Sequence, residues 1–179
     1  MSRGGAPEGG TVFLGCDDSG FAMKLEIIRR LEELGVPFRD CGSGPEPSRY
    51  PYYAARVAAA VSTGEARRGI LVCGSGIGMS IAANKFPGVR AACVGDAYSA
   101  RLTRRHNDSN VLCLGGQLLG SWAALEIVEV WLSTEYDGGH HDGSLELLAA
   151  LEAENFSGGL WAPDEPPYPP FDWDPGQKL

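Results

Sequence analysis

Short apolar runs alternate with helical stretches along most of the chain, and this alternation is the feature that most limits the fold. The runs are rich in valine, leucine, isoleucine and cysteine, which is typical of buried strands. They cover residues 11–16, 36–41, 69–73, 89–94 and 110–116. Strands that are separated by helices form parallel sheets. With right-handed crossovers, the sequence predicts an α/β fold, namely a three-layer αβα sandwich with a Rossmann-like, five-stranded parallel sheet.

The stretches between the runs have apolar residues three or four positions apart, the spacing that gives a helix one apolar face. Residues 21–34 show this spacing most clearly, and Gly35 is expected to end that helix. Further helices are expected at residues 52–62, 79–84, 97–105, 122–133 and 145–154.

The chain is expected to form one domain with a looser segment at each end. Its length of 179 residues suits a single core. Residues 1–10 are interpreted as a flexible leader because they lack the apolar core of a signal peptide, and residues 11–155 as the domain. Residues 156–179 hold six of the twelve prolines and show no helical or strand period. They are expected to form an extended arm on the same or a neighbouring subunit, the alternative being a disordered tail.

Charge and cysteine content exclude several classes of protein. The net charge of −8 disfavours a nucleic-acid partner, although a small anion could still bind at a local site. No apolar run approaches the roughly 20 residues of a membrane helix, so no membrane partner is expected. The five cysteines are odd in number and form no CxxC pair, which fits reduced thiols in a cytoplasmic protein better than disulfides or a zinc site.

Polar and reactive residues follow several of the predicted strands. In open α/β sheets, ligands bind beyond the carboxyl ends of the strands. Asp17 and Asp18 follow the first strand, residues 73–78 the third, Asp96 the fourth and residues 115–117 the fifth. A buried cysteine is often only a small apolar residue, but this convergence favours a reactive thiol at Cys73.

A glycine-rich loop follows Cys73 and leads into a predicted helix; we call it the glycine loop. Its members are Gly74, Ser75, Gly76, Ile77 and Gly78. Successive backbone N–H groups at a helix start can hold a phosphate or a developing oxyanion, and they also stabilise a nearby thiolate. Removal of a proton next to a carbonyl needs a base and donors for the oxygen, and Cys73 with this loop supplies both. The alternative is a tight turn without a ligand.

Known nucleotide motifs and metal sites do not fit the sequence. The glycine spacing is not GxGxxG and no GxxxxGK[ST] occurs, so no cofactor is expected. His140 and His141 precede Asp142, but adjacent histidines rarely bind one ion and no fourth ligand is evident, so no metal is expected. His106 lies near a predicted helix end, where it is either a general acid or base or a capping residue.

Five motifs follow one another between about residue 11 and residue 154. They are "GCDDSGF", "YPYYA", "GILVCGSGIGMSIAANKFPGVRAA", "RRHNDSNVL" and "YDGGHH". Together they resemble the ribose-5-phosphate isomerase B family, which includes the galactose-6-phosphate isomerase subunits. The long central motif is highly specific, so the chain is identified as a member of this family of sugar isomerases.

The resemblance implies an aldose–ketose isomerase that needs no metal and works through a cis-enediol(ate). In the family, a cysteine at the Cys73 position moves the proton, and a histidine at the His106 position helps to open the sugar ring near an aspartate at the Asp17 position. Ser75, in place of a threonine, and the loop N–H groups are implied to bind the enediolate oxygens. Further substrate-contacting positions match Tyr50 and Asn107. Family members are dimers or tetramers with each site at the junction of two subunits, so a homodimer or homotetramer is expected.

The chain departs from the family at positions that bind the substrate phosphate in the family. Asp18 replaces a histidine, and Gln117, His140 and Ser144 replace arginines. Each lost charge-assisted hydrogen bond contributes roughly 1.5–3 kcal/mol, so a phosphate should bind orders of magnitude more weakly. The predicted substrate is therefore a sugar or sugar acid that is unphosphorylated or anchored differently. Arg49 stands where the family commonly has aspartate and is a candidate partner for a substrate carboxylate.

Three alternatives stay open. The first is a phosphosugar isomerase of the ribose 5-phosphate type whose anion is held by Arg49, Arg101, Arg104 or Arg105. The second is a weakly active subunit that needs a paralogous partner. The third is a sugar- or nucleotide-binding module without chemistry, against which the joint presence of Cys73, His106 and Asp17 argues, because binding alone needs no thiol base.

Overall fold

The computed structural model describes residues 10–156, and their core is a five-stranded parallel sheet. The strands are β1 (Val12–Cys16), β2 (Phe38–Asp40), β3 (Arg68–Cys73), β4 (Ala91–Cys93) and β5 (Val111–Gly115). They are arranged in the order β2-β1-β3-β5-β4. The predicted α/β sandwich is thus confirmed, whereas nearly all of the predicted leader and C-terminal arm lies outside the described residues.

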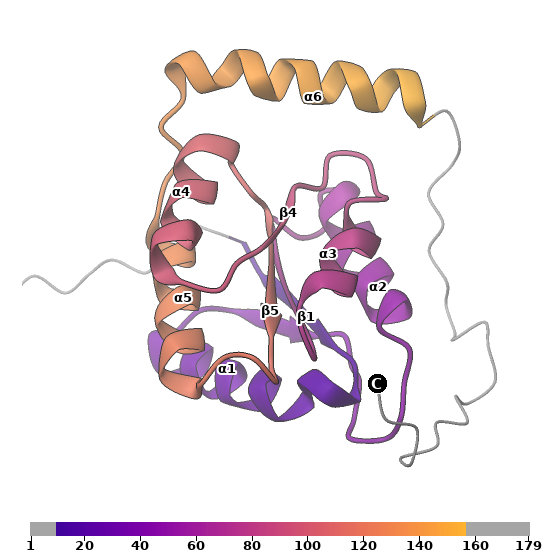
Figure 1. Cartoon of the computed structure of the whole chain (residues 1–179), viewed down its shortest axis with the longest axis vertical. Helices are drawn as coiled ribbons and strands as arrows, with labels where there is room; N and C mark the ends of the chain where they lie inside the picture. The colour runs from indigo at the N-terminus through magenta and orange to yellow at the C-terminus, as the bar shows by residue number, and fades with distance from the viewer. Residues whose placement is uncertain (1–9, 157–179) are drawn as a thin grey trace, which may run out of the picture.

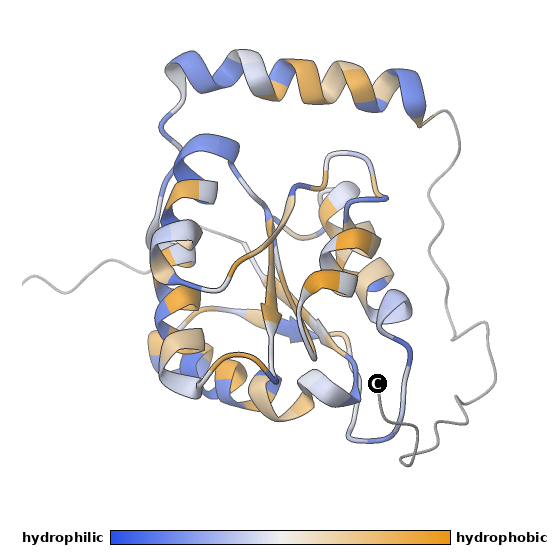
Figure 2. Cartoon of the chain, viewed as in Figure 1, coloured by the Kyte–Doolittle hydropathy of each residue, from blue (hydrophilic) through white to orange (hydrophobic). Residues whose placement is uncertain are grey.

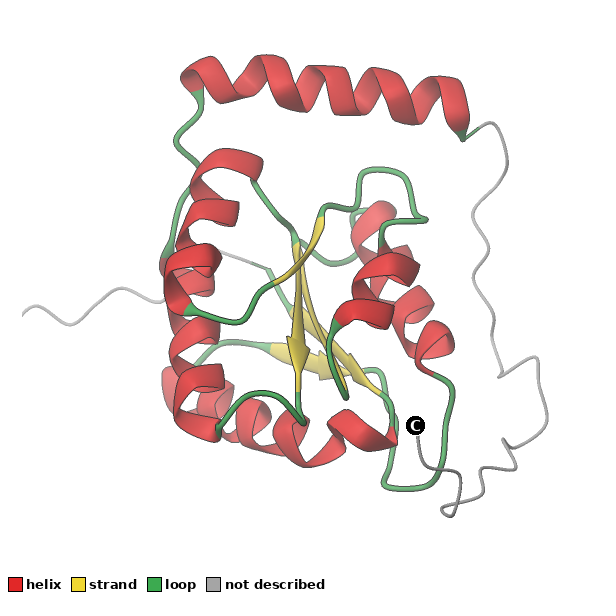
Figure 3. Cartoon of the chain, in the orientation of Figure 1, coloured by secondary structure: helices red, strands yellow, loops and turns green. Residues whose placement is uncertain are grey.

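Helices cover both faces of the sheet (Figures 1 and 3). The helices are α1 (Phe21–Leu34), α2 (Tyr50–Ser62), α3 (Ile77–Ala83), α4 (Ala97–Asn107), α5 (Ser121–Ser133) and α6 (Asp142–Asn155), with short 3₁₀ turns η1 (Asp18–Gly20) and η2 (Gly139–His141). Side chains alternate along β3, so Ile70 and Val72 join the core beneath α1 and α5, whereas Leu71 and Cys73 join the core beneath α2 and α3. Cys73 therefore points to the α2–α3 side of the sheet.

Helix ends follow the local sequence. α1 ends where Gly35 adopts a left-handed conformation with φ of 67°, as its sequence predicts. α4 begins at Asp96, whose carboxylate accepts a hydrogen bond from the Ser99 N–H at 2.7 Å, and ends at Asp108 with φ of 44°. The predicted second strand is longer than the observed β2, which begins only after Pro37.

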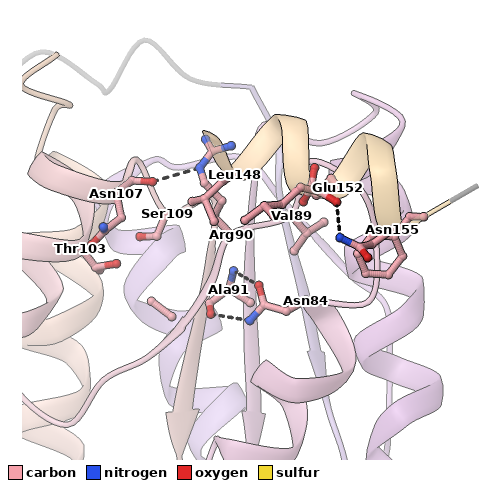
Figure 4. Close-up of a pocket in the computed structure, with 13 residues that line it drawn as sticks. Asn84, Val89, Arg90, Ala91, Thr103, Asn107, Ser109, Leu148, Glu152 and Asn155 are labelled. Carbon is pink, nitrogen blue, oxygen red and sulfur yellow. Dashed lines mark hydrogen bonds between the residues drawn. The ribbon is translucent and has the colours of Figure 1, made fainter. Parts of the chain in front are cut away.

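Helix α6 lies across one end of the molecule, apart from the two cores (Figure 1). None of its residues is buried, and Leu147, Leu148 and Leu151 are all exposed. Figure 2 shows apolar and polar residues mixed along this helix. A cavity of about 460 Å³ separates α6 from the body of the molecule (Figure 4). No helix of residues 10–156 has the length and apolar character required to cross a membrane.

Candidate active site

The carboxyl edge of the sheet brings together the residues that follow β1, β3 and β5. A Cβ atom on Gly20 would lie 2.4 Å from the carbonyl oxygen of Val72, so only glycine allows η1 to approach the end of β3 this closely. The Gly116 N–H donates to the carbonyl oxygen of Cys73 at 2.8 Å. The turns after all three strands are thereby fixed against one another, with Cys73 between them.

The Cys73 thiol lies at the mouth of the glycine loop. Its side chain is mostly buried, with 5% of the residue exposed, and its Sγ accepts a hydrogen bond from the Gly76 N–H at 3.1 Å. Gly76 has φ of 78°, a conformation that favours glycine and turns this N–H toward the sulfur. Ser75 lies between them, and its Oγ accepts a weaker contact from the Ile77 N–H at 3.4 Å. The loop therefore directs a backbone amide at the sulfur.

Asp17 is a buried carboxylate on the turn after β1. It accepts hydrogen bonds from the Ser19 hydroxyl at 2.6 Å and from the Gly20 N–H at 3.0 Å. Burial raises the pKa of Asp17 above its usual value, while these two donors act in the opposite direction. The side chain is thus held in one place, close to the turn that contacts β3.

Neutral and acidic groups line the rest of this edge. The Gln117 Oε1 would lie 3.0 Å from a Cβ on Gly74, so this amide covers the start of the glycine loop. The ring of Tyr50 covers Gly78 in the same way, at 2.9 Å. Asp18 faces the loop before α2, because its Oδ1 accepts a hydrogen bond from the Ser48 N–H at 3.0 Å.

Arg49 marks the start of α2 beside these groups. It is the N-cap residue of that helix and is exposed. Its neighbour Ser48 contacts Asp18, so the loop before α2 brings the backbone of Arg49 near Asp18 although the two are distant in the sequence.

A second group of candidate residues lies at the opposite edge of the sheet. His106 and Asn107 occupy the last turn of α4, just before β5 begins. At that level the Gly69 N–H donates to the Asn110 carbonyl, and Gly69 pairs with Val111. The four-residue step along β3 from Gly69 to Cys73 spans about 13 Å. Within one chain, His106 and Cys73 therefore lie at opposite ends of the strands.

Three histidine rings meet at this second edge. The rings of His106 and His141 stack with centroids 4.4 Å apart and planes 19° apart, and the His140 ring lies 3.8 Å from that of His141. Burial lowers the pKa of His141, and the neighbouring His140 and His106 lower it further. Ser144 is exposed in the first turn of α6, close in the chain to these rings.

Hydrogen bonds between Arg105 and Asp137 hold the loop after α5 against the last turn of α4 at this second edge. The Arg105 Nε contacts both carboxylate oxygens of Asp137, at 3.1 and 2.9 Å, and the Asp137 N–H donates to the Arg105 carbonyl at 3.0 Å. The Arg105 guanidinium lowers the pKa of Asp137. Tyr136 donates to Asp142 at 2.8 Å, and burial together with this carboxylate raises its pKa to about 12.

The structure thus divides the candidate residues into two sets. The first, at the carboxyl edge, holds Asp17, Asp18, Tyr50, Cys73, the glycine loop and Gln117. The second, at the amino edge, holds His106, Asn107, His140 and Ser144. The cavity below α6 belongs to the second set, because Asn107 lines it (Figure 4).

Sequence reasoning missed Ser48, Ser19 and Asp137. Ser19 stands inside the "GCDDSGF" motif, and Asp137 inside "YDGGHH", so both motifs carried a signal that could have singled them out. Ser48 lies in a loop whose approach to Asp18 depends on folding, and no sequence signal marks it.

Comparison with known proteins identifies the family. Residues 12–148 match the Ribose/Galactose Isomerase family model. Ribose-5-phosphate isomerase B of Escherichia coli (strain K12) is 47% identical over 142 residues, which cover 79% of this chain and 95% of that protein. The 4-deoxy-4-sulfo-D-erythrose isomerase of Clostridium sp. (strain MSTE9) is 41% identical over 139 residues, covering 76% of this chain and 87% of that protein.

The fold agrees with the same family. The structure of ribose-5-phosphate isomerase B from Clostridium thermocellum superposes with a TM-score of 0.80 at 42% identity, and the match covers 81% of this chain and 99% of that one. A family model over most of the chain, close relatives and a shared fold all lead to one assignment. The chain therefore belongs to the ribose/galactose isomerase family and is a sugar isomerase.

Proposed function

We propose that the chain interconverts an aldose and a ketose through a cis-enediol(ate), with Cys73 as the base. The observation that carries this proposal is the hydrogen bond from the Gly76 N–H to the Cys73 Sγ at 3.1 Å. A backbone amide that faces the sulfur stabilises the thiolate, which is the form that accepts a proton. Neither a metal nor a cofactor is required by this chemistry.

We propose a role for each group around the thiol. The Cys73 sulfur takes a proton from the carbon next to the carbonyl and returns it to the neighbouring carbon. The negative charge then develops on the oxygens, where Ser75 and N–H groups of the glycine loop act as donors. A positioned base contributes about 10²–10⁴ in rate, and one oxyanion donor about 3 kcal/mol. Asp17, which is buried beside the same turn, orients the substrate hydroxyls.

The site is completed by a second copy of the chain. His106 is proposed to open the sugar ring, yet it lies at the opposite edge of the sheet from Cys73 in one chain. A homodimer, or a homotetramer built from it, places His106 and Asn107 of one copy against Cys73 of the other. The exposed Leu147, Leu148 and Leu151 of α6 are an apolar surface that such an assembly would cover.

The substrate is proposed to be a sugar or sugar acid that is unphosphorylated or anchored without arginine forks. Asp18 places a carboxylate at the carboxyl edge, held by Ser48, and Gln117 places a neutral amide over Gly74. A carboxylate repels a phosphate dianion but accepts hydrogen bonds from sugar hydroxyls. His140 and Ser144 supply no guanidinium at the other edge.

A phosphosugar isomerase is the second candidate. The 47% identity to ribose-5-phosphate isomerase B of E. coli favours it, and the relative named for 4-deoxy-4-sulfo-D-erythrose has another terminal anion in its substrate. The structure bears on which arginines could bind the substrate anion. Arg104 is 3% exposed and bound to Asp108, and Arg105 is bound to Asp137, so either guanidinium would have to leave a carboxylate before it could bind the anion.

A panel of sugars in heavy water distinguishes these two candidates. Free tetroses, pentoses, hexoses and sugar acids are compared with ribose 5-phosphate and 4-deoxy-4-sulfoerythrose by NMR. We expect isomerisation of an unphosphorylated substrate, with deuterium entering next to the carbonyl as the enediolate is quenched. Higher kcat/KM on ribose 5-phosphate than on every unphosphorylated sugar would contradict the substrate assignment and support the second candidate.

Replacement of the thiol tests the proposed base. Cys73→Ala should lower kcat by about 10³ or more and abolish deuterium exchange, because the variant lacks the proposed base. Cys113→Ala is a matched control, since this buried thiol lies on β5 within the core and has no role in the proposal. Unchanged exchange in Cys73→Ala would remove Cys73 from its role.

A further inference from the structure

Three potential metal ligands meet at the amino edge of the sheet although they are far apart in the sequence. They are His106 at the end of α4, Asp137 in the loop after α5 and His141 in η2. One ligand atom from each lies within 4.8 Å of the others. The sequence drew attention to the adjacent pair His140 and His141, but folding instead combines His141 with two residues from other elements.

The three side chains are held near one another by the surrounding structure. The Arg105 guanidinium and the Arg105 carbonyl both bind Asp137, which fixes the loop against the last turn of α4. The stacked rings of His106 and His141, 4.4 Å apart, fix η2 against the same turn. The ligands are thus supplied by a preorganised junction of three segments.

The donor set determines which ions fit. Two imidazole nitrogens and one carboxylate oxygen suit Zn²⁺ and neighbouring first-row ions, whereas Mg²⁺ and Ca²⁺ prefer oxygen ligands alone. Metal–ligand distances near 2.1 Å require donor atoms about 3.4 Å apart in a tetrahedral site. Asp137 is exposed and the two histidines are half-buried, so side-chain rotation, in which Asp137 exchanges a contact with Arg105 for the ion, can bring the donors to this separation without repacking the core.

We propose that His106, Asp137 and His141 form a binding site for a divalent transition-metal ion such as Zn²⁺, with water as the remaining ligand. The bound ion inhibits the enzyme, because it occupies the imidazole that is proposed to open the sugar ring. The inhibition rests on the proposed role of His106, whereas the binding itself does not.

Titration of the untagged full-length chain with Co²⁺ and Zn²⁺ tests the binding. We expect one ion per chain, with visible Co²⁺ absorption of nitrogen and oxygen ligation. Asp137→Asn and His141→Asn should each weaken binding at least about tenfold. His140→Asn is the matched control, since its ring lies 3.8 Å from that of His141 but lies outside the three-ligand group, and it should bind within about twofold of wild type.

Several results would overturn the proposal. Equal weakening in His140→Asn, absence of a Co²⁺ spectrum, or a sulfur-to-metal band that moves the ion to Cys93 or Cys73 would each do so. Circular dichroism of every variant separates lost binding from lost folding. Binding is measured without substrate, so a failed isomerase assay leaves it interpretable. If the wild-type enzyme binds Zn²⁺ with the expected mutational pattern but is not inhibited by it, the inhibition is wrong and the site stands.

Discussion

Gly76 gives the Cys73 site both its donor and its shape. Its φ of 78° turns the N–H toward the sulfur. A Cβ atom there would lie 2.9 Å from the carbonyl carbon of Leu114 and 3.0 Å from the Cys93 Sγ. The loop can therefore sit against β5 only because this residue has no side chain.

Gly76→Ala should lower kcat by about 10² or more, since the displaced loop no longer presents its N–H groups to the sulfur and the enediolate. Gly88→Ala is a close control, because Gly88 has φ of 74° but nothing within 4 Å of its Cβ position. Both variants should lose about 1 kcal/mol of stability from the left-handed backbone. Steady-state kinetics that show equal losses in the two variants would contradict the role of the loop.

Asp17 links the site to the pH dependence of stability. Burial raises its pKa in the folded state, so the folded protein binds this proton more tightly than the unfolded chain does. The stability gained from protonation is present at low pH. It is lost as the pH rises from the pKa of Asp17 in the unfolded chain, 3.8, through its raised pKa in the folded protein.

Asp17→Asn should therefore increase stability at neutral pH relative to wild type, and this difference should shrink as the pH falls toward 3.8. Denaturant unfolding at a series of pH values measures it. Activity should fall in the same variant. Lower stability of Asp17→Asn than of wild type at neutral pH would show that the hydrogen bonds from Ser19 and Gly20, rather than burial, dominate at this carboxyl group.

At the scale of helices and strands, the periodic apolar patterns predicted which elements form. Contacts between segments distant in sequence decided where each element lies in the fold. The apolar spacing predicted α1 and its end at Gly35, because each amphipathic element must bury one face. The strand order could not be predicted, since the position of β5 between β3 and β4 depends on contacts distant in sequence. The placement of His106 and Cys73 at opposite edges follows instead from the parallel direction of β3 and β5, which the alternation of strands and helices did predict.

The motifs predicted which residues form the candidate site, but they did not predict which other residues those residues contact. Cys73 with its glycine loop is local in sequence, so its arrangement follows from one turn. The junction of Arg105 with Asp137 and the stacking of His106 on His141 depend on how a loop returns to α4, for which the sequence holds no periodic signal.

No residue of helix α6 is buried within one chain. Leu148 and Leu151 are 45% and 55% exposed. Leu148→Asp together with Leu151→Asp should leave the fold of the single chain intact but weaken self-association by at least about tenfold, because charged groups disfavour an apolar interface. Sedimentation velocity measures this. Leu25→Asp is the control and should not reproduce the effect, because Leu25 is 42% exposed on α1, on the face of the sheet away from Cys73.

At the scale of the whole molecule, the proposed function gives each chain two half-sites. The carboxyl edge carries a thiol, an amide-lined loop and the Asp17 turn, and the amino edge carries the imidazoles. In the proposed homodimer, a two-fold axis would make each surface available to the partner, so one contact between copies would generate two complete sites. The assembly is thus a requirement for activity in this account.

Mixing two inactive variants tests this claim most directly. Cys73→Ala and His106→Asn are each expected to be inactive alone, and they are mixed in equal amounts under conditions of subunit exchange. Half of the dimers formed at random are mixed, and each contains one site with both residues intact, so we predict recovery of about a quarter of wild-type activity. Native mass spectrometry that detects mixed dimers, without activity above the sum of the separate variants, would contradict the account.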